Sequence, residues 1–80
     1  MKYREIMFLQ GDAAAEALKV LDAHGEEEAA EYLARWETGE EAERVEAPWG
    51  TRDTVVKLDD GYILTYNLGL GYIGLVAEVA

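Results

Sequence analysis

The sequence predicts an α+β fold in which helices come first and a three-stranded antiparallel meander follows. Apolar residues in the first half recur at helical spacing, whereas the second half is rich in β-branched and aromatic residues. Eighty residues allow one domain with one core, and half of the residues are hydrophobic. We therefore expect a single domain over residues 1–80, with a helical half at 1–46, a loop at 47–52 and the meander at 53–79. The helices should lie on one face of the sheet.

Two consecutive helices are predicted within the helical half. The first begins near Asp12, a residue type that caps first turns, and ends at His24–Gly25. The second runs from about Glu26 to Glu37, and Gly39 ends it. The apolar faces are Ala14, Ala17, Leu18 and Leu21 in the first helix and Ala29, Leu33 and Trp36 in the second. Because the link is short, we expect an antiparallel helical hairpin.

Residues 3–9, ahead of the first helix, fit two patterns. Tyr3, Ile6 and Met7 would share one face of a helix. The alternation that is typical of a strand is also present, in Tyr3, Glu5, Met7 and Leu9. We predict a short helix there and keep the strand as the alternative.

Three strands are predicted in the second half, over residues 54–58, 62–66 and 72–77. Asp59-Asp60-Gly61 predicts a hairpin turn, because Asp and Gly tolerate the positive φ angles of tight turns. A glycine-rich loop over residues 67–71 joins the second strand to the third. The last strand is apolar on both faces, so it is either central in the sheet or paired with another chain. The second alternative predicts a homodimer through this strand.

Charge and composition disfavour several classes of function. The chain has 17 acidic residues, 7 basic residues and no cysteine, for a net charge of −10. Phosphate binding needs clustered Lys and Arg, so direct binding to nucleic acid or to an anionic membrane is disfavoured. The sequence shows neither a membrane-spanning apolar run nor a signal peptide. We expect a cytoplasmic protein.

No catalytic constellation is recognisable, and we predict no enzymatic activity, no cofactor and no metal. The chain lacks serine and cysteine, so neither nucleophile is available. His24 is explained by its place at a helix C-terminus, where a cation is favourable, and Asp59 and Asp60 by turn chemistry. A small enzyme is the third alternative, with carboxylates, Tyr, Lys and Thr as its remaining candidate catalysts.

The most unusual segment is residues 26–46, where nine glutamates against two arginines give a net charge of −7. The sequence predicts a small acidic protein-interaction domain that binds a partner protein. A basic partner is one alternative that this segment leaves open. A nucleic-acid mimic that inhibits a basic protein is the alternative, since Glu27 and Glu31 lie one helical turn apart, about 6 Å. A solvated helix face is the simplest explanation. The candidate contact residues are Trp49, Glu27, Glu31, Glu40 and Glu41.

Trp49 is a candidate because it lies in a loop, Ala47-Pro48-Trp49-Gly50. A tryptophan in such a loop either folds back on the protein or meets a partner, and tryptophan is enriched at interface hot spots. We therefore keep both outcomes open.

Three stretches carry a family resemblance: YREIMFLQGD at 3–12, GYILTYN at 61–67 and GYIGL at 71–75. They resemble short acidic proteins of actinobacterial type, a group without a known activity. The resemblance covers about a third of the chain and is loose in the glutamate-rich middle. It implies a cytoplasmic protein of a bacterium or of its phage, and it assigns no functional residue.

Overall fold

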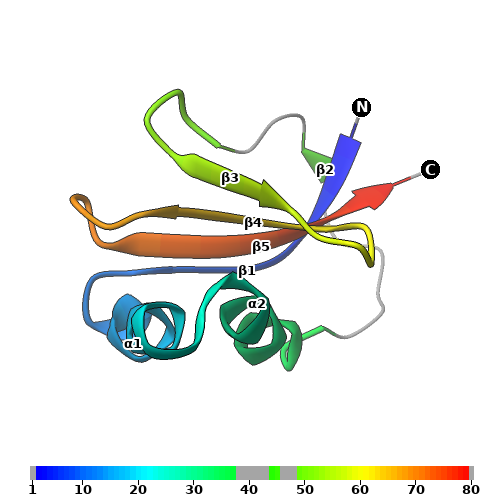
Figure 1. Cartoon of the computed structure of the whole chain (residues 1–80). Helices are drawn as coiled ribbons and strands as arrows, with labels where there is room; N and C mark the ends of the chain where they lie inside the picture. The colour runs from blue at the N-terminus through cyan, green and yellow to red at the C-terminus, as the bar shows by residue number, and fades with distance from the viewer. Residues whose placement is uncertain (1, 38–43, 46–48, 80) are drawn as a thin grey trace.

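The computed structural model of the chain describes residues 2–37, 44–45 and 49–79. An antiparallel sheet forms one layer, and two helices lie against one of its faces (Figure 1). The strands are β1 (Lys2–Gln10), β2 (Arg44–Val45), β3 (Thr54–Lys57), β4 (Tyr62–Asn67) and β5 (Tyr72–Val79). A 3₁₀ turn, η1 (Gly11–Ala14), precedes the helices α1 (Ala15–His24) and α2 (Glu26–Ala34). The predicted α+β class is confirmed.

The sheet has the strand order β2-β1-β5-β4-β3, and all neighbouring strands are antiparallel. Because β2 contributes only two residues, the sheet consists mainly of four strands. The predicted succession β3, β4, β5 is present, but the prediction of a sheet with three strands is wrong, since β1 pairs with β5 along its length. β5 is therefore central, with both edges paired within the chain. A homodimer through the last strand would need an edge that β1 and β4 occupy, and the oligomeric state stays a prediction.

Residues 3–9 form a strand, so the prediction of a short helix is wrong. Met7 and Leu9 pack toward the helices, whereas Tyr3 lies on the opposite face of the sheet. The register with β5 shifts between Glu5 and Met7, which inserts Ile6 as a bulge. Because of the bulge, the consecutive residues Ile6 and Met7 both pack on the core beneath the helices. Together with Tyr3 they therefore show the i, i+3, i+4 spacing of a helical face. The predicted helical half at residues 1–46 thus begins with a strand and also contains β2, so the helical pair is not its first element.

The main core lies between the helices and the sheet. Its buried members are Ala14, Ala17, Leu21, Ala29, Ala30, Leu33, Leu64, Ile73 and Leu75. Gly25 alone joins α1 to α2, and its φ of 93° is a conformation that glycine adopts without strain. The predicted burial of Ala29 and Leu33 is confirmed, but Trp36 lies beyond the end of α2 and is 36% exposed. Asp12 lies inside η1 and not at its cap position.

No helix in the described part of the chain has the length and apolar character that crossing a membrane requires. Gly39, which was predicted to end the second helix, lies outside the described residues. The helix ends earlier, at Ala34, and a turn follows in which Glu37 pairs with Arg4 of β1. This ion pair ties the end of α2 to the sheet.

Candidate functional site

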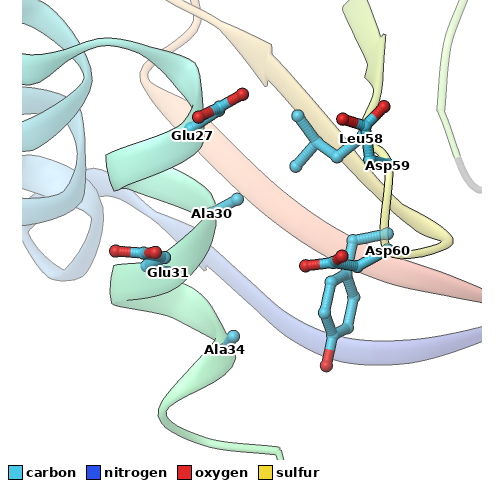
Figure 2. Close-up of a pocket in the computed structure, with 8 residues that line it drawn as sticks. Glu27, Ala30, Glu31, Ala34, Leu58, Asp59 and Asp60 are labelled. Carbon is cyan, nitrogen blue, oxygen red and sulfur yellow. The ribbon is translucent and has the colours of Figure 1, made fainter.

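A groove of about 220 Å³ opens between α2 and the turn that joins β3 to β4 (Figure 2). One wall is a face of α2, and the other is the turn with the start of β4. We call it the turn groove. Its lining residues are Glu27, Ala30, Glu31, Ala34, Leu58, Asp59, Asp60 and Tyr62.

Local sequence determines both walls of the turn groove. The four lining residues of α2 recur at spacings of three and one, so they share one face of the helix. On the other wall, Gly61 has a φ of 81° and donates its N–H to the Leu58 carbonyl at 3.3 Å. This tight turn places Asp59 and Asp60 at its tip, and Figure 2 shows the Asp60 carboxylate pointing toward α2.

The turn groove is acidic on both walls. Glu27 and Glu31 come from α2, Asp59 and Asp60 come from the turn, and no lining residue is basic. None of these four carboxylates forms a hydrogen bond or an ion pair with another residue that the structure describes. The other lining residues are apolar or aromatic. Such a groove suits a cationic group whose aliphatic stem packs on the floor while its charge meets the carboxylates.

A second groove, of about 380 Å³, lies where α1 meets α2. We call it the corner groove, and its lining residues are Leu21, Asp22, Gly25, Glu26, Tyr66 and Leu68. The Tyr66 hydroxyl donates a hydrogen bond to Glu26 Oε2 at 2.9 Å. This bond, together with partial burial, raises the pKa of Tyr66 above its ordinary value of 10.0.

Trp49 lies against the face of the sheet that the helices do not cover. Its ring meets that of Tyr3 edge-on, with the centroids 4.9 Å apart. Together with Val55 it packs on a second, smaller core of Tyr3, Ile63 and Val76. The sequence left two outcomes for this loop tryptophan, packing back on the protein or meeting a partner. The Trp49 side chain packs back on the protein. Trp49 and the two grooves are on opposite faces of the sheet.

A hydrogen-bonded carboxylate lies near Trp49 in the loop before β3. Asp53 accepts a hydrogen bond from the Tyr72 hydroxyl through Oδ1 and one from the Gly50 N–H through Oδ2, the latter at 2.8 Å. The bond from Tyr72 lowers the pKa of Asp53 below 3.8 and raises the pKa of Tyr72 above 10.0. This pair fixes the loop to β5.

We expect the protein to lose stability at alkaline pH because of these tyrosines. The pKa values of Tyr66 and Tyr72 are raised in the folded state, since ionisation would place a phenolate beside Glu26 or Asp53. Their contribution is therefore complete below pH 10.0 and is lost as the pH rises through the folded-state pKa. Urea unfolding at about pH 8 and about pH 11 should show a smaller alkaline loss for the double variant Tyr66→Phe/Tyr72→Phe. Equal losses would contradict the role of these bonds.

The structure brings some predicted site residues together and separates others. Glu27 and Glu31 are exposed and line the turn groove. Glu40 and Glu41 lie outside the described residues. Trp49 is on the far face of the sheet, so it does not join the glutamates in one surface.

Sequence reasoning missed Asp59 and Asp60 as groove residues. Turn chemistry accounts for them fully, and only the position of the turn against α2 brings them into one groove with Glu27. His24 lies in the last turn of α1, as expected from the sequence. Within residues 2–37, 44–45 and 49–79, no group of three or more acidic or histidine side chains is arranged to hold a metal ion.

Comparison of the chain with protein-family models, with curated proteins and with solved structures gives no match. No residue role is therefore transferred from another protein. The resemblance to small acidic actinobacterial proteins stays a prediction.

Proposed function

We propose that this chain is a non-enzymatic interaction domain that binds a basic segment of a partner protein at the turn groove. The observation that supports this function is a groove with two carboxylates on each wall, whose other lining residues are apolar or aromatic. Lysine and arginine combine an aliphatic stem with a terminal charge, so they are complementary to both features. The net charge of −10 adds a longer-range attraction that salt weakens. The proposed setting is the bacterial cytoplasm.

A nucleic-acid mimic is less well supported than this interaction. A mimic needs carboxylates in a row on an outer surface, so that they occupy the positions of successive phosphates. Glu27 and Glu31 instead line one groove together with Asp59 and Asp60 of the turn. This arrangement favours capture of a cationic side chain between two walls.

The test of the proposed function is neutralisation of one carboxylate on each wall. Fluorescence anisotropy with labelled octalysine should show binding that weakens with added salt. The double variant Glu27→Gln/Asp60→Asn should bind about fivefold more weakly than the wild type, because each exposed ion pair contributes up to about 1 kcal/mol. Affinity is measured at low and at high salt, which shows whether the lost binding is electrostatic. Circular dichroism shows whether the variant keeps the wild-type fold.

The matched control is the double variant Asp12→Asn/Glu16→Gln. Both residues are exposed, neither lines the turn groove or the corner groove, and the change in net charge is the same. The control should retain nearly the wild-type affinity. If both double variants weaken octalysine binding equally, attraction by net charge alone explains it, and the proposed site is wrong.

A further inference from the structure

β3 is the last strand of the sheet, and no strand that the structure describes pairs with its outer edge (Figure 1). The hydrogen bonds to β4 determine which of its backbone groups face outward. The N–H of Leu58, directly after β3, donates to the Tyr62 carbonyl at 2.8 Å, so the Leu58 backbone faces β4. In an antiparallel ladder this direction alternates from residue to residue, and the register of β3 with β4 is regular. The N–H and C=O groups of Val55 and Lys57 therefore point away from β4, toward the outer edge.

The side chains along this edge alternate in the same way. Val55 packs on the smaller core, on the face of the sheet that the helices do not cover. Lys57, two positions later, is exposed on the same face. Asp53, two positions before Val55, also points to this face, because its carboxylate accepts the hydrogen bond from Tyr72. Tyr72 itself alternates with Ile73 of the main core. On the uncovered face the edge thus presents an acid, a valine and a base at equal spacing.

This pattern is complementary to itself when two copies of the edge run antiparallel. With Val55 opposite Val55 of the second copy, Lys57 of each copy lies opposite Asp53 of the other, since both are two positions from Val55. Directly opposed residues of antiparallel strands have Cβ atoms about 5 Å apart, which allows a Lys–Asp ion pair. A register centred on Val56 would instead place Asp53 opposite Asp59, and like charges are unfavourable there. Charge therefore selects the register centred on Val55.

The same register pairs the outward backbone groups. Val55 of each copy would donate its N–H to the Val55 carbonyl of the other, and the Lys57 N–H would donate to the Asp53 carbonyl. The Asp53 N–H already donates to the Gly50 carbonyl at 3.2 Å, so it adds no bond. Because opposed residues lie on the same face, the two sheets would become continuous, with the helices of both copies on one side. The added strand would also cover Val55 and Val56, which are only half-buried.

We infer that β3 is the interface of a symmetric homodimer in which two copies pair edge to edge around Val55. A second copy fits this edge best, because a basic peptide complements only Asp53 and an acidic peptide only Lys57. The net charge of −10 on each copy opposes association, and the edge is short, so we expect a weak dimer with a Kd of about 0.1 mM. Val55 and Lys57 line neither the turn groove nor the corner groove, so this inference does not depend on the proposed function.

Sedimentation equilibrium tests the dimer and its interface. Between about 10 µM and about 1 mM protein, the mass should rise from that of one chain toward that of two. Val55→Pro should weaken association about tenfold, because proline removes the outward N–H but no hydrogen bond to β4. Lys57→Glu should weaken it by about the same factor, since both ion pairs of the dimer become repulsive, and Lys57→Arg should preserve it. The matched control is Lys19→Glu, an equal change in net charge at an exposed residue of α1, which should change the affinity by less than about twofold.

Cysteine substitution tests the register. The chain has no cysteine, so Val55→Cys introduces one thiol per copy. In the inferred register the two thiols are opposite each other, with Cα atoms about 5.5 Å apart, a separation that a disulfide spans. Under mild oxidation Val55→Cys should therefore form covalent dimers faster than the control variant Val56→Cys. The reverse order would show that the strands pair around Val56 and would overturn the inferred register.

The other outcomes are equally decisive. A wild-type protein that stays monomeric at about 1 mM overturns the inference. A dimer that neither Val55→Pro nor Lys57→Glu weakens uses another surface, and the inference is then wrong. Equal weakening by Lys57→Glu and Lys19→Glu would mean that net charge, and not the Lys57–Asp53 pair, controls association. Circular dichroism shows whether Val55→Pro is folded, and if it is not, Lys57→Glu decides.

Discussion

Replacement of Leu33 by alanine is expected to lower the free energy of unfolding by about 3 kcal/mol. Leu33 is fully buried where α2 meets the sheet, and two of its neighbours in the core are Ala29 and Ala30. These small side chains cannot extend into the space that the substitution leaves, so a cavity adds to the lost burial. A domain of this size has a total stability of about 5–15 kcal/mol, so this single change removes a large share of it.

Urea unfolding followed by far-ultraviolet circular dichroism measures this loss. The matched control is Leu70→Ala, the same chemical change at a residue that is 64% exposed. The control should change the stability by less than about 0.5 kcal/mol. A Leu33→Ala variant as stable as the Leu70→Ala variant would show that α2 does not pack on the sheet through this face.

Replacement of Trp49 by alanine is expected to destabilise the protein by about 2 kcal/mol, less than for a fully buried tryptophan. The substitution removes the edge-on contact with Tyr3 and uncovers Val76 and Ile63. The affinity of the folded protein for octalysine should not change, because Trp49 and the turn groove lie on opposite faces of the sheet. Urea unfolding and the anisotropy assay on the same sample separate the two effects.

Trp36→Ala is the matched control for this substitution. The Trp36 ring lies beside Tyr32 and under the Arg35 guanidinium, which is 4.3 Å from its centroid, and it belongs to neither core cluster. We expect Trp36→Ala to lower the free energy of unfolding by less than Trp49→Ala does. If Trp49→Ala retained full stability and lost octalysine binding, Trp49 would be the contact residue that the loop sequence suggested.

The elements of the second half could be predicted because each signal there is local. β3, β4 and β5 follow runs of β-branched and aromatic residues, and the turn between β3 and β4 follows from Asp59-Asp60-Gly61. The helices follow from alanine and leucine at helical spacing. Such signals depend on a few neighbouring residues, so they can be recognised without knowledge of the tertiary structure.

β1 could not be predicted from its own pattern, because its apolar residues serve two cores. Tyr3 packs on one face of the sheet and Leu9 on the other, and the bulge at Ile6 interrupts the alternation. A signal was nevertheless present elsewhere in the sequence. A last strand that is apolar on both faces needs a neighbouring strand on each edge. The predicted meander supplies one neighbour, and residues 3–9, which show strand-like alternation, could supply the other.

The candidate site was predicted only in part. Glu27 and Glu31 follow from charge and helical spacing, but the presence of Asp59 and Asp60 in the same groove depends on where the turn packs. The sequence of a hairpin does not determine which helix the hairpin packs against. The position of Trp49 likewise depends on Tyr3, which is far away in the sequence and could not be paired with it by local pattern.

The pairing of β1 with β5 also determines how this chain must fold. Lys2 and Val79 are partners in the sheet although 77 positions (79 − 2) separate them, and Figure 1 shows the two strand ends side by side. The helices and the β3–β4 hairpin consist of local contacts that form within microseconds. The β1–β5 ladder instead requires closure of nearly the whole chain, which has a large entropic cost before any contact compensates for it. We therefore expect the docking of β1 on β5 to limit the rate of folding. Until this step is complete, the apolar strand β1 stays exposed to other chains.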